Sequence, residues 1–584
     1  MGVSRGSSRH VLLTRHFLRQ FLENDLIAPD ADRSLMLATV GAGLVSLTLC
    51  ISVIVSANYL MGLWTPGQVA IHSLNDKFFY LAAGMIVTAL VAASQWDALA
   101  LDVRDAAILE PLPVHAATIR RAKVSAVAIL GMSVAVAVNV CPTLVFPLLM
   151  VFTLRQMSAV ALVELMAAHA IFTIAAAVFG YLAIIALREL LAAVLGPRWF
   201  ARVSPWAQCT VIVMLGGSLL LLPPAAGRIG ARAFDDWRTM TPPMWFLGAY
   251  ELSVGGVIAD LPRSEMRPRQ EVADRNGTAL YERRRPSFPA LARRAAFAFA
   301  ATIAVAVVAY LWNARRLPSL SPTPMAAFRR RWRAISHFAN ATLLRGDATQ
   351  AGFYFTLAAM WRSRTHRLTL ACAIAVGFAM AIVALSNANV AQGASPRLLS
   401  VQPLVFGALL VGFRHAIRVP AELRANWGFQ LAWRGRERAY IAGVKRAAIV
   451  GLVLPAFLVL LPLFVFVLGP RLALMNAVLG LAGAIVLLEA LMAGYDKVPF
   501  ACTYLPSENM KVLAPVYTIV FLAGASLFAR MQYDALVGTG MMRALLTLAI
   551  TFACFRIMSL KRQRLAYVRF DEAPASFQRL GLDT

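Results

Sequence analysis

The chain consists of long apolar runs separated by short polar connections, a pattern that restricts it to a membrane. A membrane-spanning helix needs about 20 apolar residues, and twelve runs approach or exceed that length. They lie near residues 36–58, 78–96, 125–152, 159–187, 207–225, 295–313, 367–387, 399–416, 447–469, 472–494, 512–529 and 542–559. None shows the alternation that is typical of a transmembrane barrel. We therefore expect an all-α polytopic membrane protein with about 12 transmembrane helices.

The composition excludes a soluble domain. Hydrophobic residues make up 59% of the 584 positions and charged residues only 15%, far from the composition of soluble globular domains. The net charge of +27 could suggest nucleic acid, but the basic residues gather in connections on one side of the runs, as orientation signals do. We therefore expect the lipid bilayer, and not nucleic acid, as a partner. The 50 arginines against 6 lysines indicate a GC-rich genome and hence a bacterial inner membrane.

The basic residues also predict the orientation. Segment 314–366 carries nine arginines and one acid, Asp347, which places it in the cytoplasm by the positive-inside rule. Counting runs from this segment puts both termini in the cytoplasm. The expected domains are an amphipathic helix (1–33), a first six-span half (34–313), a basic linker with a surface helix (314–366), a second six-span half (367–559) and a cytoplasmic tail (560–584). The first domain could equally be an orientation signal alone.

One connection, 226–294, is long and is expected on the outer side. It contains an apolar and aromatic stretch at 241–258 that is too short to span the membrane. We expect this stretch to dip into the outer interface, with Trp245, Phe246 and Tyr250 at the level of the lipid headgroups. The alternative is a small folded cap without a role in substrate binding.

The two halves share one plan. Each begins with a basic surface helix, continues with six runs, and carries a polar island after its second run, at 97–124 and at 417–446. Shifting one half by 322 residues pairs Lys123 with Lys445 together with several apolar positions. Parallel duplication of a six-span unit is a known transporter plan. We therefore expect a 6+6 pseudo-repeat with cytoplasmic amphipathic and coupling helices.

The island at 97–124 interrupts two apolar runs with four acids and four bases. An amphipathic helix is expected before Pro111, because Pro111 and Pro113 lack N–H groups and bend the chain. A basic helix that begins near His115 should follow. The pattern predicts a helix, a rigid elbow and a second helix on the water side of the membrane, although an ordinary interfacial loop would also fit.

The chain lacks the motifs of enzymes that hydrolyse nucleotides or peptides with a bound metal. GxxxxGK[ST], HExxH and DDxxD are all missing, and the six cysteines are scattered without a CxxC pair. We therefore expect no catalytic residues, metal site or cofactor in this chain. If ATP drives its activity, ATP and Mg²⁺ bind to another polypeptide.

The stretch ILEPLPVHAATIRRAK, residues 108–123, resembles a cytoplasmic pattern of the permeases of ATP-binding-cassette (ABC) type-2 exporters, as do PPMWFLGAYE (242–251) and KVPFACTYLP (497–506). The resemblance implies an exporter permease whose two elbows dock on a separately encoded ABC ATPase dimer. It implies an apolar first tip and flanking charged groups, namely Pro111, Leu112, Pro113 and Val114 with Glu110, Arg120 and Lys123. The second half departs from the pattern, with Trp433 to Arg436 where the first has Pro111 to Val114.

The second elbow is basic instead of apolar. Its cluster could dock on acidic patches of the ATPase or on anionic lipid. The cluster comprises Arg434, Arg436, Arg438 and Lys445.

Charges within membrane spans are costly, so ionisable residues there are candidates for function, and we single out three of those within the predicted spans. Glu164 and His169 lie five residues apart in the fourth run, and Glu489 lies in the tenth. Glu164 and His169 could relay protons or could make a polar contact between helices. Glu164 and Glu489 are expected at opposite membrane depths and so are not equivalent.

We therefore expect the membrane-spanning permease of an ABC exporter that works by alternating access and is driven by a separate ATPase. The alternatives are an ion-coupled secondary transporter with twelve spans and, from another class, a membrane enzyme or assembly factor. Lipids, drugs, peptides and glycans all remain open as substrates.

Overall fold

The computed structural model describes most of the chain in separate stretches. These are residues 5–22, 33–60, 64–96, 115–153, 158–226, 237–259, 268–315, 340, 344–386, 393–420, 437–493, 495, 497–501, 508–537, 549–550 and 552–557. This part of the chain is helical and contains no β-strand. The all-α expectation is therefore confirmed for it.

Ten helical segments of the described residues are long and apolar enough to cross a membrane. They coincide with the first ten of the predicted runs, the first being Ala42–Leu60 and the tenth Pro470–Met492. The eleventh run falls in a helix, Glu508–Val537, that is not among the ten, and most of the twelfth lies outside the described residues. Ten candidate spans are thus established, and twelve remains a prediction.

Residue contacts divide the chain into two compact units. Unit 1 comprises Met1–Val211 and Ser218–Leu320, and unit 2 comprises Ile212–Gly217 and Ser321–Thr584. The boundary near Leu320 falls within the basic connection at 314–366. Each unit is described separately below.

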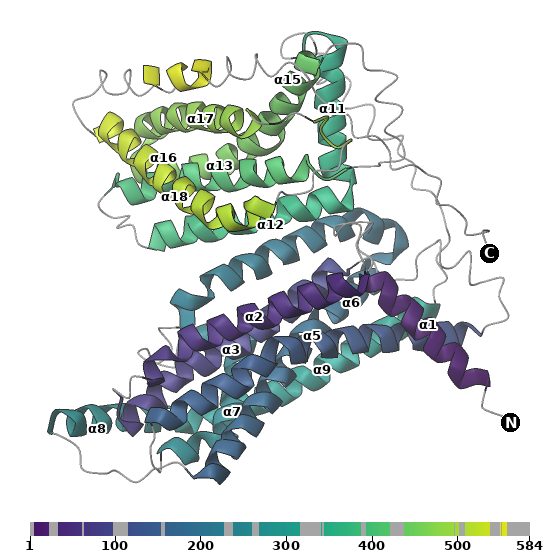
Figure 1. Cartoon of the computed structure of the whole chain (residues 1–584), viewed down its shortest axis with the longest axis vertical. Helices are drawn as coiled ribbons and strands as arrows, with labels where there is room; N and C mark the ends of the chain where they lie inside the picture. Colours follow the sequence, from purple (N-terminus) through teal and green to yellow (C-terminus); the bar gives the residue numbers. More distant parts are fainter. Residues whose placement is uncertain are drawn as a thin grey trace. The chain divides into compact units, whose positions relative to one another are not determined.

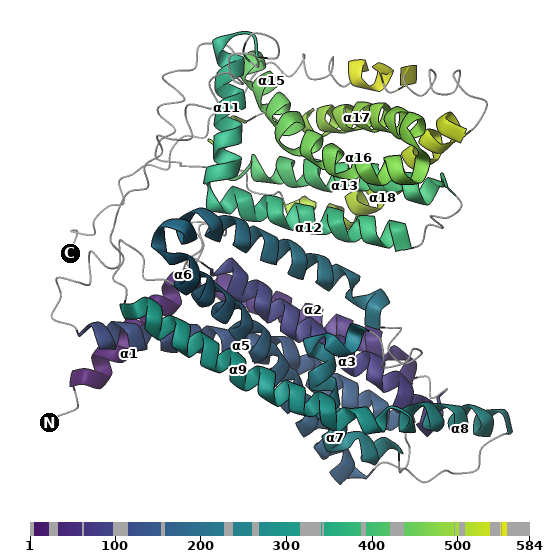
Figure 2. The ribbon, with the colours of Figure 1, turned by 180° about the vertical axis from the view of Figure 1, so that it is seen from behind.

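Unit 1 is a bundle of long helices (Figure 1). Its elements are α1 (Arg5–Leu22), α2 (Arg33–Leu60), α3 (Pro66–Ser94), α5 (Ala116–Thr153), α6 (Ala159–Ala226), η1 (Trp237–Met240), α7 (Pro242–Ala259), α8 (Pro268–Glu282), η2 (Arg285–Ser287) and α9 (Phe288–Arg315). Figures 1 and 2 show α1 and α8 at opposite ends of this bundle. We call the end at which α2 joins α3 the cap end, and the end at which α3 precedes residues 97–114 the island end.

Local sequence explains where two of these helices begin and bend. Thr65 caps α3: its hydroxyl accepts from the Gln68 amide while the Gln68 side chain accepts from the Thr65 amide, and Pro66 occupies the first turn. In α6, Gly196 has φ 68° and ψ 168°, a conformation that residues with a Cβ rarely adopt. This break separates the fourth and fifth candidate spans.

Most of the described residues of the long connection 226–294 form helices of unit 1. Helix α7 packs against α3 and α9, and α8 packs on the first turn of α3, where the Gly67 amide donates to Asp274 Oδ1 at 2.6 Å. Phe246 is 4% exposed and Tyr250 is fully buried, both in the core of unit 1. Neighbouring helices therefore cover these two aromatic side chains, and their position at the level of the lipid headgroups stays a prediction. Trp245 is partly buried, and its indole donates to the Thr239 carbonyl.

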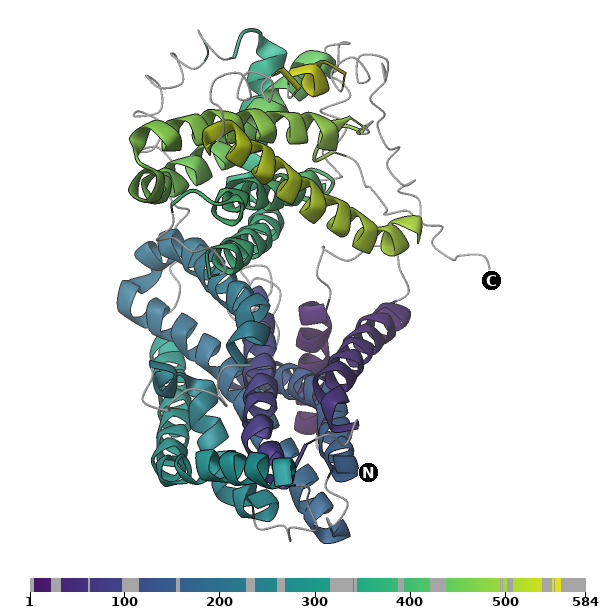
Figure 3. The same cartoon turned by 90° about the vertical axis from the view of Figure 1, so that its left-hand side faces the viewer.

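Unit 2 is a second helical bundle, in which the helix Asp347–Arg362 crosses the others at one end (Figure 1). Its elements are α11 (Asp347–Arg362), α12 (Arg364–Ser386), α13 (Pro396–Ala416), α15 (Glu437–Ala448), the π-helical turn η5 (Ile449–Val453), α16 (Leu454–Leu468), α17 (Pro470–Met492) and α18 (Glu508–Val537). Figure 3 shows α18, in yellow, running obliquely across the green helices. Helix α18 packs mainly on α13.

The crossing of α11 with α15 brings two backbones into contact. A Cβ placed on Gly352 would lie 2.2 Å from the Tyr440 carbonyl oxygen, and one on Gly443 would lie 2.1 Å from that of Thr349. Only glycine allows backbones to approach so closely. The crossing is therefore fixed by residue size on both helices.

Candidate functional site

An ion pair lies fully inside unit 1 near its cap end. Lys77 Nζ on α3 and Glu251 Oε1 on α7 are 2.5 Å apart, and each side chain is 1% exposed. The Tyr281 hydroxyl on α8 donates to Glu251 Oε2 at 2.8 Å, and Lys77 Nζ lies 4.9 Å from the ring centroid of Tyr250. Three helices thus converge on one buried carboxylate.

Aromatic and polar side chains surround this pair. The hydroxyl of Tyr250 lies 3.2 Å from Nδ1 of His169 on α6, and His169 is enclosed by the rings of Tyr80, Phe146 and Tyr250. Burial and the neighbouring Glu251 raise the pKa of Tyr250 well above its usual value, so its hydroxyl stays protonated. The Nε2 atom of His169 is buried and has no hydrogen-bond partner among the described residues.

A second carboxylate lies next to the pair in sequence. Asp76 Oδ2 accepts a 2.6 Å hydrogen bond from the Tyr59 hydroxyl on α2, and Tyr80 lies 3.2 Å from the Ser56 hydroxyl. Desolvating two charges is costly, and a buried pair persists only with good geometry and further hydrogen bonds. We call Asp76, Lys77, His169, Tyr250, Glu251 and Tyr281 the cap-end cluster.

A different polar cluster lies at the island end of unit 1. Arg188 on α6 pairs with Glu189, and its Nε donates to the Trp96 carbonyl at 2.9 Å. The Asn313 amide on α9 donates to Glu189 Oε2 at 2.8 Å. Trp96 is fully buried, and its indole donates to Ser204 at 2.8 Å. Side chains from α6 and α9 therefore anchor the residue that directly precedes island residues 97–114.

Unit 2 shows a similar arrangement next to its own island. Lys445 on α15 pairs with Glu489 on α17. The carbonyl of Ile417, at the end of α13, accepts from the Tyr495 hydroxyl and from the Phe500 amide, both at 2.9 Å. Here too, polar groups anchor the chain on both sides of residues 421–436, the central part of the island at 417–446.

The structure describes only part of the predicted coupling set. Arg120 and Arg438 are exposed, whereas Lys123 is 6% exposed and lies over the ring of Phe17 on α1. Lys445 points to Glu489 instead of forming an open basic patch. The remaining members lie outside the described residues, namely Glu110, Pro111, Leu112, Pro113, Val114, Arg434 and Arg436.

Glu164 and His169 do not share one surface. Glu164 is exposed, while His169 is fully buried and faces α7 through Tyr250. Five residues along a helix rotate a side chain by more than a quarter turn, which explains the difference. The polar interhelical contact considered for His169 is present, and its partner is Tyr250.

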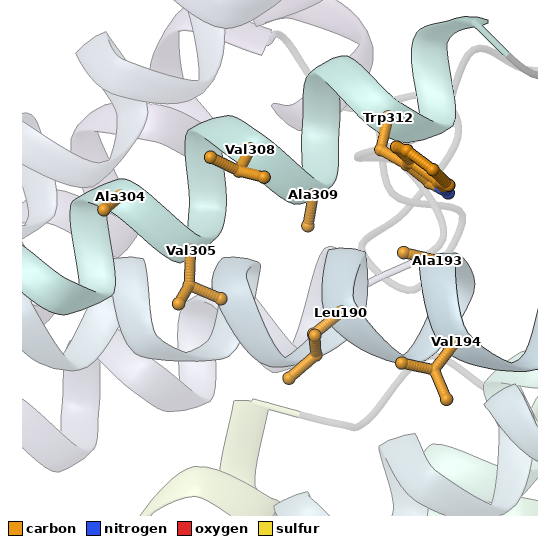
Figure 4. A pocket seen from close by; sticks show the side chains of 8 residues that line it. All are labelled: Leu190, Ala193, Val194, Ala304, Val305, Val308, Ala309 and Trp312. Carbon is orange, nitrogen blue, oxygen red and sulfur yellow. The ribbon is translucent and has the colours of Figure 1, made fainter.

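An apolar groove of about 500 Å³ lies between α6 and α9 in unit 1 (Figure 4). Its lining carries no ionisable side chain and comprises Leu190, Ala193, Val194, Ala304, Val305, Val308, Ala309 and Trp312. Both helices belong to candidate spans. The groove is therefore suited to contact with hydrocarbon and not to polar chemistry.

Of the cap-end cluster, only His169 and Tyr250 are among the residues predicted from the sequence. Lys77 lies one residue before the second predicted run, which begins at 78, whereas α3 begins at Pro66. Glu251 was overlooked within an aromatic stretch. Both residues could have been found from the sequence, because an ionisable residue within an apolar helix is a candidate for function.

The fold and these buried charges define an all-helical, multi-pass membrane protein. Comparison with known proteins finds no matching family model, no matching curated protein and no matching solved structure. Among the described residues, no three His, Cys, Asp or Glu side chains gather to hold a metal ion.

Proposed function

We propose that the chain is the membrane-spanning permease of an ABC exporter, with its two islands docking on a separate ATPase dimer. The observation that carries the proposal is the anchoring of both islands. A buried Glu pairs with a base near the root of each, Glu189 with Arg188 and Glu489 with Lys445. A docking element must transmit motion to the spans, and rigidly held chain segments on either side of an island permit this.

A repeated contact pattern supports the 6+6 part of the proposal. In unit 1, α1 packs on α5 through a cluster that contains Phe17, Ile119 and Ala126. In unit 2, α11 packs on α15, which carries Ile441 and Ala448. The 322-residue shift pairs Ile119 with Ile441 and Ala126 with Ala448. In both halves, the surface helix therefore packs on the helix that contains or follows the end of the island.

The test is assembly with the ATPase encoded nearest to this gene. Leu112→Asp with Val114→Asp should abolish co-purification and coupled ATP hydrolysis, because charges would replace an apolar docking tip. The matched control is Arg434→Asp with Arg436→Asp, which should reduce coupling less. Undiminished assembly and ATP hydrolysis in the first variant would refute the proposal, provided that both variants elute as single species.

The cap-end cluster favours a second candidate, an ion-coupled transporter. Buried acids and bases inside a membrane protein commonly mark proton or ion pathways. Proteoliposomes that contain only this chain would then move protons down a pH gradient, and Glu251→Gln would stop the flux. The structure places Glu164 at the surface, so Glu251 is the better position for this test.

A further inference from the structure

Three carboxamide side chains are buried in unit 2 with unsatisfied polar groups. Gln402 on α13, Asn476 on α17 and Gln532 on α18 are each at most 1% exposed. Within the described part of the chain, Gln402 Oε1 and both side-chain polar atoms of Asn476 and Gln532 lack a hydrogen-bond partner. Buried polar groups are nearly always bonded, so each exception calls for an explanation.

Gln402 and Asn476 lie close together across the contact between α13 and α17. A Cβ placed on Gly480 would lie 2.1 Å from Cδ of Gln402, so the Gln402 side chain rests on the α17 backbone at that glycine. Asn476 precedes Gly480 by four residues and therefore lies on the same helical face, one turn away. The two amides are thus neighbours.

Gln532 enters the same junction from α18. Ala529 and Leu536 lie on its helical face and pack in one apolar cluster with Leu399 of α13. Phe528, four residues before Gln532, contacts α17 at Gly483, which lies seven residues after Asn476 and so on the same helical face. Leu399 precedes Gln402 by three residues, so it lies on the same face of α13. Three helices therefore direct one carboxamide each toward a common junction.

In the described parts of α13, α17 and α18, the charged residues nearest in sequence to the three carboxamides are all exposed, namely Arg397, Arg471, Arg530 and Asp534. Carboxamides offer donors and acceptors without net charge, whereas hard cations prefer sites that include carboxylates. The chemistry suits a neutral ligand that both donates and accepts hydrogen bonds.

We propose that Gln402, Asn476 and Gln532 bind the uncharged, hydroxyl- or amide-bearing part of the transported substrate. Transport of this ligand rests on the proposed function, but the binding step itself does not involve the ATPase. Failure of the ATPase assembly experiment would therefore leave this site intact, and failure of the binding experiment would leave the permease proposal intact.

The experiment measures the Tm of the full chain in phosphatidylcholine nanodiscs with four probes. Trehalose supplies hydroxyls, N-acetylglycinamide supplies amides, and choline chloride and sodium glutamate are charged contrasts. At least one neutral probe should raise the Tm, and the responsive probe separates the hydroxyl from the amide class. Asn476→Leu and Gln532→Met should each abolish the shift.

The same variants distinguish a binding site from structural hydrogen bonds. Without probe, their Tm should equal or exceed that of the unmodified chain, because an apolar group of similar size replaces an unsatisfied amide. The matched control is Gln208→Met: Gln208 is also 1% exposed, but its Nε2 donates to the Ala93 carbonyl at 2.9 Å. The control should lower the Tm and keep the probe shift.

Four results would overturn the proposal. They are no shift with either neutral probe, a shift with charged probes only, a shift that persists in both variants, and a probe-free Tm that falls in both variants as much as in Gln208→Met.

Discussion

Lys77 and Glu251 show how strongly one side chain can depend on another inside this protein. Each is 1% exposed, and Glu251 also accepts from Tyr281. Removing one member of a buried pair leaves an uncompensated charge, which costs about 3–5 kcal/mol, whereas replacing both by apolar groups is often neutral. The two residues therefore stabilise the protein mainly because each charge neutralises the other inside the bundle.

This dependence predicts the outcome of a double-mutant cycle. Lys77→Met should lower the free energy of unfolding by about 3–5 kcal/mol because Glu251 remains buried without its base. Lys77→Met combined with Glu251→Leu should recover most of that loss. The measurement is unfolding of the purified chain in mixed detergent micelles.

The control for this cycle is an exposed pair, Arg275 with Glu271, whose side chains are 74% and 54% exposed. Arg275→Met should change stability by less than about 1 kcal/mol, because exposed pairs contribute little. A double variant as unstable as Lys77→Met alone would show that the pair is not the source of the effect.

At the scale of elements, helix positions were predictable and packing partners were not. Apolar length alone located the ten candidate spans, because a bilayer requires runs of that length. It could not locate α7, since 18 residues of apolar and aromatic sequence suit an interfacial helix and a buried one equally well. Burial of Tyr250 depends on α3 and α6, which lie far away in sequence.

The candidate site was predictable only in part, for the same reason. His169 and Glu489 stood out because each interrupts an apolar run. Their partners, Tyr250 and Lys445, could not be identified, since pairing depends on helix rotation and on which helices are neighbours. Lys77 was missed because its helix was expected to begin at 78, whereas α3 begins at Pro66.

The crossing of α11 and α15 gives a prediction at this scale. Gly443→Ala should destabilise unit 2 by about 1–3 kcal/mol, the usual cost of overpacking, because its Cβ would lie 2.1 Å from a backbone oxygen that cannot move independently. The measurement is the Tm of the purified chain.

Gly524→Ala on α18 is the control, since nothing lies within 4 Å of a Cβ there. It should be neutral or stabilise by about 0.5–1 kcal/mol, and equal effects of the two changes would contradict a tight crossing.

At the scale of the whole molecule, the chain consists of two compact helical units, and the proposed pseudo-repeat requires both islands on one side of the membrane. Arg120 lies in the first island and Arg438 in the second, while Arg269 lies on α8 at the opposite end of unit 1. All three side chains are exposed. Cysteine placed at these positions reports sidedness directly.

In a chain freed of its native cysteines, a membrane-impermeant maleimide should label Arg269→Cys in intact spheroplasts. Arg120→Cys and Arg438→Cys should react only after the membrane is permeabilised, because both are expected in the cytoplasm. Labelling of Arg120→Cys and Arg438→Cys from opposite sides would rule out the 6+6 arrangement.

The Lys77–Glu251 pair also has a consequence for how the protein is made. The two residues are 174 positions apart, so at a synthesis rate of about 5–20 residues per second Lys77 leaves the ribosome roughly 10–30 s before its partner. During that interval α3 must enter the bilayer with an uncompensated lysine, at about 2.5–3.5 kcal/mol for a central position. The remaining apolar residues of α3 have to outweigh that cost, so changes that reduce their hydrophobicity should impair insertion even where they leave the finished fold undisturbed.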